Sequence, residues 1–282
     1  MYRILSGMRF AICNETYQDT PFDEDCAHVA ACGYDGIEIA PFTFDDDPSR
    51  ITEQQATTLG KTAAAAGLAV VGLHWLLVKP PGLHITTPDD AVREHTIAFV
   101  EHLTRLCAAM GGNVLVFGSP KQRNLAEGQA YDDAMRRGVD SFRRICETAQ
   151  PLGVTLALEP LGPAETNFMS SSAETVRIIE AVDHPACQLH LDVKERTTEA
   201  ESIRQIIARC AKHMAHVQAN DANMRGPGFG DVDFLPIAQA LKAANYDGYV
   251  SVEVFDYKPD AQTIARKSID YLKKTFAAAG AV

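Results

Sequence analysis

Four polar residues in the second half of the chain have the types and spacing of a divalent metal site. They are Glu159, Asp192, Gln218 and Glu253, and they end the segments GVTLALE, CQLHLD, MAHVQ and YVSVE. Successive members lie about 30 residues apart, the length of a strand, a helix and their loops. Three carboxylates at one place would repel one another unless a cation compensated them. One divalent ion meets this need, and oxygen ligands favour Mn²⁺ or Mg²⁺, although Co²⁺, Ni²⁺ or Zn²⁺ can also bind.

The elements that position these residues are predicted from the hydrophobic pattern. Short apolar runs predict eight strands, near residues 8–13, 35–39, 68–74, 113–117, 154–159, 187–192, 214–218 and 249–253. Stretches with helical periodicity lie between them, such as the segment from Tyr131 to Ala149. The strands are continuously apolar, as expected where helices cover a parallel sheet. Eight such units favour an α/β fold of the (β/α)8 TIM barrel type, as a single domain over residues 1–282.

Other polar residues at strand ends are candidates for substrate binding, because TIM barrels build their active sites there. His74 ends the third predicted strand and precedes Trp75, so we expect the imidazole to bind substrate while the indole shields the pocket. Glu38 ends the second predicted strand and should reach the same cavity. His190 faces the barrel interior by the two-residue period of a strand, either as a core residue or as a support for the site. For each residue taken alone, a purely structural role is the alternative.

Composition argues against several classes of function. The 282 residues carry a net charge of −11, which disfavours nucleic acid because phosphate binding depends on Lys and Arg. No stretch approaches the roughly 20 apolar residues of a membrane span, and we expect no membrane partner. The 7 cysteines are scattered without a CxxC pair, so we expect reduced thiols and a cytoplasmic location.

Four blocks of the sequence resemble a known enzyme superfamily. The blocks LEPLGPAETNF, LHLDVKE, HVQANDANMRGPGFGDVDF and SVEVF look like those of the sugar phosphate isomerase/epimerase superfamily, the xylose-isomerase-like TIM barrels. The similarity runs in order from about Met8 to Ala278. It implies the TIM barrel fold and a single divalent metal ion bound by the four residues named first.

Within the superfamily, the ligand pattern resembles that of the ketose 3-epimerases, which have a histidine where this chain has Gln218. The dehydroshikimate dehydratases resemble the glutamine variant instead. Glu165 matches a second family glutamate, which implies contact with substrate oxygens. Glu195 stands where the epimerases have a substrate-binding histidine. Met224 stands where they have an arginine, and Arg225 follows, so Glu195 and Arg225 are the substrate-binding candidates at these departures.

The resemblance also implies a mechanism. The metal would stabilise an enediolate of a small polyhydroxylated carbonyl substrate, with Glu159 and Glu253 acting as base and acid. A sugar isomerase or epimerase is therefore the predicted activity. A metal-dependent dehydratase, which is a lyase, and a non-catalytic sugar-binding barrel stay open as alternatives. Many members of the superfamily are dimers or tetramers, so a homo-oligomer is also expected.

Overall fold

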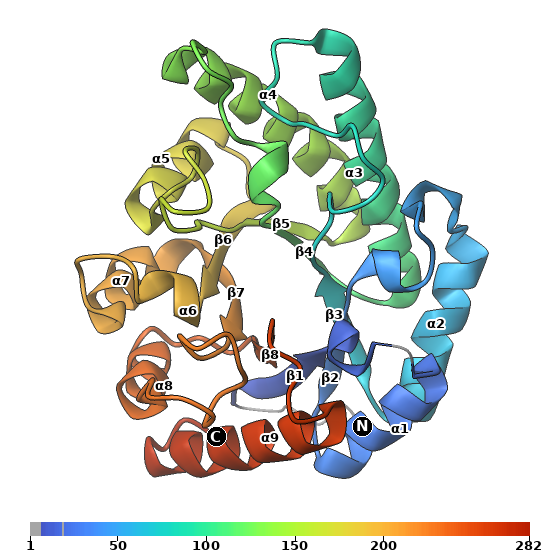
Figure 1. The fold of residues 1–282 in the computed structure, drawn as a ribbon, viewed down its shortest axis with the longest axis vertical. Helices are drawn as coiled ribbons and strands as arrows, with labels where there is room; N and C mark the ends of the chain where they lie inside the picture. The colour runs from blue at the N-terminus through green and yellow to red at the C-terminus, as the bar shows by residue number, and fades with distance from the viewer. Residues whose placement is uncertain (1–6, 19) are drawn as a thin grey trace.

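The strands of the computed structural model, which describes residues 7–18 and 20–282, close into a barrel (Figure 1). All neighbouring strands are parallel, and they follow one another around the barrel in chain order. They are β1 (Arg9–Cys13), β2 (Gly36–Ile39), β3 (Ala69–Leu73), β4 (Val114–Phe117), β5 (Thr155–Leu158), β6 (Cys187–Asp192), β7 (Met214–Ala219) and β8 (Tyr249–Val252). The predicted (β/α)8 barrel is thereby confirmed, and each strand falls within a residue or two of its expected range.

Helices surround the barrel on its outer side (Figure 1). They are α1 (Phe22–Cys32), α2 (Glu53–Ala65), α3 (Asp90–Met110), α4 (Tyr131–Ala149), α5 (Ser172–Val182), α7 (Ile203–Cys210), α8 (Phe234–Ala243) and α9 (Ala261–Ala278). The short helix α6 (Val193–Arg196) instead follows β6 without a loop and lies at the carboxyl end of that strand. The helix predicted from Tyr131 to Ala149 is confirmed as α4. The last helix, α9, packs beside α1, so the outer ring of helices closes as the barrel does.

Local sequence sets the helix boundaries. Thr52 and Gln55 form a capping box that begins α2, and Asp89 accepts hydrogen bonds from the first amides of α3. Gly111 ends α3 with a φ of 87°, a left-handed conformation that favours glycine. After Gly111 a short turn returns the chain to the barrel, where β4 begins at Val114. No helix in the described residues is long and apolar enough to cross a membrane.

The apolar core lies between the strands and the helices, while polar side chains occupy part of the barrel interior. Phe10 of β1 meets Phe276 of α9 edge to face, with ring centroids 5.2 Å apart. Inside the barrel, Glu38, His190 and His216 are buried. Asp192 and Gln218 are register partners on β6 and β7, so they lie at the same height near the carboxyl ends of the strands.

Candidate metal centre

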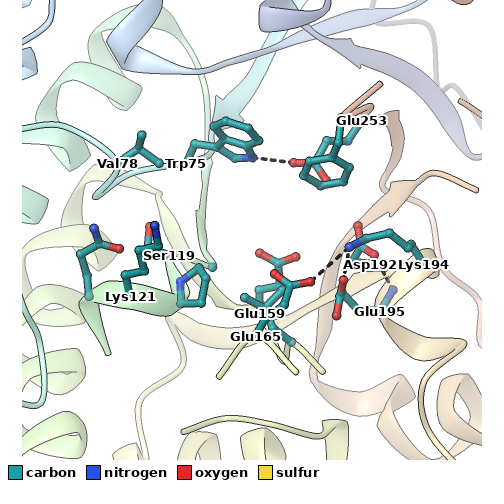
Figure 2. Close-up of a pocket in the computed structure, with 15 residues that line it drawn as sticks. Trp75, Val78, Ser119, Lys121, Glu159, Glu165, Asp192, Lys194, Glu195 and Glu253 are labelled. Carbon is teal, nitrogen blue, oxygen red and sulfur yellow. Dashed lines mark hydrogen bonds and ion pairs between the residues drawn. The ribbon is translucent and has the colours of Figure 1, made fainter. Parts of the chain in front are cut away.

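Three of the four predicted metal ligands line one cavity at the carboxyl ends of the strands. The cavity has a volume of about 440 Å³, and Glu159, Asp192 and Glu253 form part of its wall together with Trp75 and Phe255. Figure 2 shows the three carboxylates around its centre, with Glu253 and Glu159 on opposite sides. All three residues are buried. Sequence positions far apart thus converge where a TIM barrel carries its chemistry.

The charges of these carboxylates are poorly compensated. Burial, together with the charges of Asp192 and Glu253, raises the pKa of Glu159 well above its ordinary value. Burial and the charge of Glu253 raise the pKa of Asp192 to about 8. Both carboxyl groups therefore disfavour the ionised form in the protein alone. A divalent cation would remove this penalty, and the set of oxygen donors fits a hard metal ion.

Two further features fit a metal ion at this position. A Cβ atom at Gly118 would lie 2.1 Å from Oε2 of Glu159, so a larger residue there would displace that carboxylate from its present position. His190 is fully buried, its Nε2 lies 4.0 Å from Glu159 Oε1, and neither ring nitrogen has a hydrogen-bond partner among the described residues. Ligand atoms of Glu159, His190 and Asp192 all lie within 4.8 Å of one another. A buried nitrogen without a hydrogen-bond partner among the described residues therefore lies beside two of the predicted ligands.

Asn220 connects the carboxylates and was missed by sequence reasoning. Its Nδ2 donates to Asp192 Oδ2 at 2.5 Å and lies 3.4 Å from Glu253 Oε2. Its Oδ1 accepts a hydrogen bond from the backbone amide of Lys194 at 2.8 Å. The signal was present, because Asn220 follows Gln218 by two residues and so continues the same face of β7.

Trp75 and His74 hold the carboxylate of Glu253. The indole Nε1 donates to Glu253 Oε1 at 2.8 Å, and Nδ1 of His74 lies 3.4 Å from the same oxygen. Phe42 and Phe255 stack on Trp75 with ring centroids 5.7 and 5.9 Å away. Trp75 also has a φ of 52°, a rare backbone conformation for a bulky residue, of the kind that clusters at functional sites. The indole is therefore fixed in place and orients Glu253.

Lys194 is a cation in the cavity that sequence reasoning also missed. Its Nζ pairs with Glu195 and lies 3.3 Å from Glu165 Oε1. The same ammonium group sits 4.8 Å from the ring centroid of Phe255. All of these side chains line the cavity. Glu165 and Glu195 thus lie where substrate contacts were predicted, with Lys194 between them.

The remaining predicted residues do not line this cavity. Glu38 and His74 are completely buried beneath it: Glu38 contacts His216 and Gln218, and His74 Nε2 lies 2.9 Å from Glu15 Oε2. Gln218 is buried as well and is not part of the cavity wall, and its amide nitrogen faces Glu38.

Arg225 extends away from the cavity. Its guanidinium lies 3.4 Å from Asp256 and donates to the carbonyl of Lys258 at 2.8 Å. These partners already occupy the guanidinium, so a role for Arg225 in binding substrate would require the loop to rearrange.

The raised pKa values predict how the stability of the metal-free protein depends on pH. The pKa of Asp192 is about 8 when folded and about 4 when unfolded, so the native state binds its proton more tightly. This stabilisation is complete below about pH 4 and is lost as pH rises toward 8. We expect the melting temperature in chelator to fall from pH 5.5 to 8, and the Asp192→Asn variant to show a smaller fall. The raised pKa of Asp192 would be contradicted if the melting temperature of the wild type rose over this interval while that of Asp192→Asn did not.

A family model described as "Xylose isomerase-like TIM barrel" matches residues 26–275 of the chain. The chain belongs to the xylose isomerase-like TIM barrel family. Membership agrees with the resemblance drawn from the sequence blocks and with the closed barrel. In this xylose isomerase-like barrel, Glu159, Asp192 and Glu253 lie at the carboxyl ends of the strands, where TIM barrels carry their active sites.

Several known proteins are similar to this chain over most of its length. A "Probable ketose 3-epimerase" from Synechocystis sp. is 24% identical, and the match covers 86% of this chain and 87% of that protein. A "D-psicose 3-epimerase" from Ruminiclostridium cellulolyticum is 27% identical, covering 80% of this chain and 76% of its own. The solved structure of an L-ribulose 3-epimerase superposes with a TM-score of 0.86 at 22% identity, covering 97% of this chain and 96% of its own. At this identity, the structural likeness supports the fold alone.

Proposed function

We propose that this protein is a divalent-metal-dependent sugar epimerase that acts on a small free ketose. The observation that carries the proposal is the convergence of Glu159, Asp192 and Glu253, buried and poorly compensated, on one cavity of sugar-binding size. Similarity to ketose 3-epimerases supports the class of reaction. Mn²⁺ or Mg²⁺ is the proposed metal, because the donors are mainly carboxylate oxygens.

The residues of the chain have distinct proposed roles. Glu159, Asp192 and Glu253 would hold the metal, and a neutral oxygen of Gln218 would complete the set. When bound, a divalent ion supplies an electrophile that acidifies the carbon next to a carbonyl group. Glu159 and Glu253 face the cavity from opposite sides, so one can remove a proton from that carbon and the other can return one to the opposite face. Inversion at a single carbon is the result.

The part of the cavity wall beside Glu159 and Asp192 would bind the rest of the sugar. Glu165 and Glu195 offer acceptors for hydroxyl groups, and the ammonium group of Lys194 offers donors. The pairing of Lys194 with both carboxylates keeps these groups in place before the substrate arrives. We therefore propose Glu165, Glu195 and Lys194 as the polyol-binding group.

The test is a panel of ketoses incubated with the Mn²⁺-loaded protein. D-fructose, D-psicose, D-tagatose and L-ribulose are separated by chromatography, and dehydration is followed by ultraviolet absorbance. We expect a new epimer from at least one ketose and no new absorbance. Absorbance without an epimer would indicate the dehydratase, and tight binding without any product would indicate the sugar-binding barrel. The comparisons favour neither alternative, because the relatives named above are epimerases.

The hydrogen bond from Trp75 to Glu253 gives a further prediction. We expect Trp75→Phe to weaken Mn²⁺ binding by about 10-fold or more, because groups that orient a ligand usually contribute 10- to 100-fold to metal affinity. Phe keeps the stacked ring but cannot donate to the carboxylate. Phe42→Leu is the matched control, because it removes a stacking partner and leaves the indole N–H in place. Equal losses in the two variants, measured by calorimetry, would show that packing rather than the hydrogen bond matters.

Three broader expectations belong to the same proposal. We propose that the whole chain acts as one domain, in the cytoplasm, and as a dimer or tetramer. The seven cysteines support a reducing compartment, because all of them are free and six are buried. Light scattering on the purified protein would give the oligomeric state.

A further inference from the structure

The amide group of Gln218 is held on its nitrogen side. Nε2 donates to Glu38 Oε1 at 3.3 Å and lies 3.4 Å from His74 Nδ1 and 3.7 Å from Cys13 Sγ. Among the described residues, no side chain or backbone group donates to the amide oxygen. The nitrogen of Gln218 thus faces the polar groups inside the barrel, and its oxygen is the free end.

Glu38 decides this orientation because an ionised carboxylate can only accept hydrogen bonds. Its other oxygen already has His216 Nε2 at 3.1 Å and Cys13 Sγ at 3.5 Å as donors. A reversed amide would put the oxygen of Gln218 against a buried carboxylate oxygen, which is repulsive.

We infer that Glu38 is a positioning residue that turns the amide oxygen of Gln218 toward the proposed metal centre. Gln218 pairs in register with Asp192 on one side and with Ser251, two residues before Glu253, on the other. Its oxygen therefore belongs between two of the proposed ligands. The inference rests on the proposed metal site. It gives Glu38 the role of orienting the ligand Gln218, in place of the substrate contact predicted from the sequence. It also explains how glutamine can serve where the ketose 3-epimerases have histidine.

The test is a double-mutant cycle on Mn²⁺ affinity, measured by calorimetry. Glu38→Gln keeps the shape of the side chain but adds donors, so it no longer selects one orientation of the amide. We expect Glu38→Gln and Gln218→Leu each to weaken binding by about 10- to 100-fold. The double variant should bind within about 3-fold of Gln218→Leu, because Glu38 has no amide left to orient.

If the loss of Mn²⁺ affinity in the double variant equals the product of the two single losses, the role of Glu38 is overturned while the metal site stands. A wild type that binds no Mn²⁺ would overturn the metal site and this inference with it. A second measurement needs no variant at position 38. With ¹⁵N-glutamine labelling and Mg²⁺, the side-chain NH₂ signals of Gln218, identified by their loss in Gln218→Leu, should exchange slowly with solvent. Fast exchange would place the nitrogen away from Glu38 and overturn the inference.

Discussion

We expect the Glu159→Gln/Glu253→Gln variant to retain no metal after purification and to lose at least about 1,000-fold in turnover, the scale of general acid–base catalysis. The same variant should melt at a higher temperature than the wild type when both are metal-free. Both effects have one cause, because the wild-type carboxylates are buried near one another with little compensation. Neutral amides remove that repulsion and also remove the charge that attracts the cation.

The matched control is Glu174→Gln, which neutralises a buried carboxylate outside the cavity. Glu174 accepts hydrogen bonds from Tyr131 at 2.6 Å and from Ser170 and the amide of Met169 at 2.8 to 3.0 Å. These donors stabilise its charge, so Glu174→Gln should lower the melting temperature and leave metal content unchanged. Elemental analysis and thermal unfolding, with and without chelator, measure both quantities. A double variant that keeps one equivalent of metal would contradict the assignment of the ligands.

Arg123→Met is expected to destabilise the fold by about 3–5 kcal/mol, the usual consequence of removing one partner from a buried set of charges. The guanidinium is completely buried and donates to the backbone carbonyl of Glu159 at 2.7 Å. Its charge is the main favourable one near the carboxylate of Glu159. Removing it takes away a support for the loop after β5 and leaves Glu159 less compensated.

The surface variant Arg144→Met provides the comparison for Arg123. Arg144 makes two contacts of 2.6 Å with Glu94, but both side chains are partly exposed. Solvent-exposed pairs contribute at most about 1 kcal/mol. Denaturant unfolding in chelator compares the two variants directly. Similar losses of stability in both would show that burial of Arg123 does not set its contribution.

The positions of the strands and of the three carboxylates could be predicted from the sequence. Continuous apolar runs mark strands that are covered on both faces, and a polar residue at the end of such a run must lie near the rim. Glu159, Asp192 and Glu253 are of this kind. The helix from Tyr131 to Ala149 was predicted by its periodicity and is confirmed.

The height of each side chain in the barrel could not be predicted in this way. Strands of a barrel are staggered by its shear, so residues at equivalent sequence positions end at different levels. Glu38 and His74 also end apolar strands, yet they lie beneath the cavity rather than on its wall. The contact between Trp75 and Glu253 joins residues far apart in the chain, and no local pattern indicates it. Arg123 likewise stands in a loop with no periodic signal.

The most direct test of a metal-dependent proton transfer is to incubate a ketose in D₂O with the Mn²⁺-loaded protein. The metal is then removed, and the sugar is analysed by ¹H NMR. We predict that deuterium replaces hydrogen at a single carbon next to the carbonyl, that the epimer carries the same label, and that chelator or Glu159→Gln/Glu253→Gln abolishes both. Epimer formed without solvent deuterium, or exchange that persists in the double variant, would contradict the assignment of Glu159 and Glu253 as the groups that move the proton.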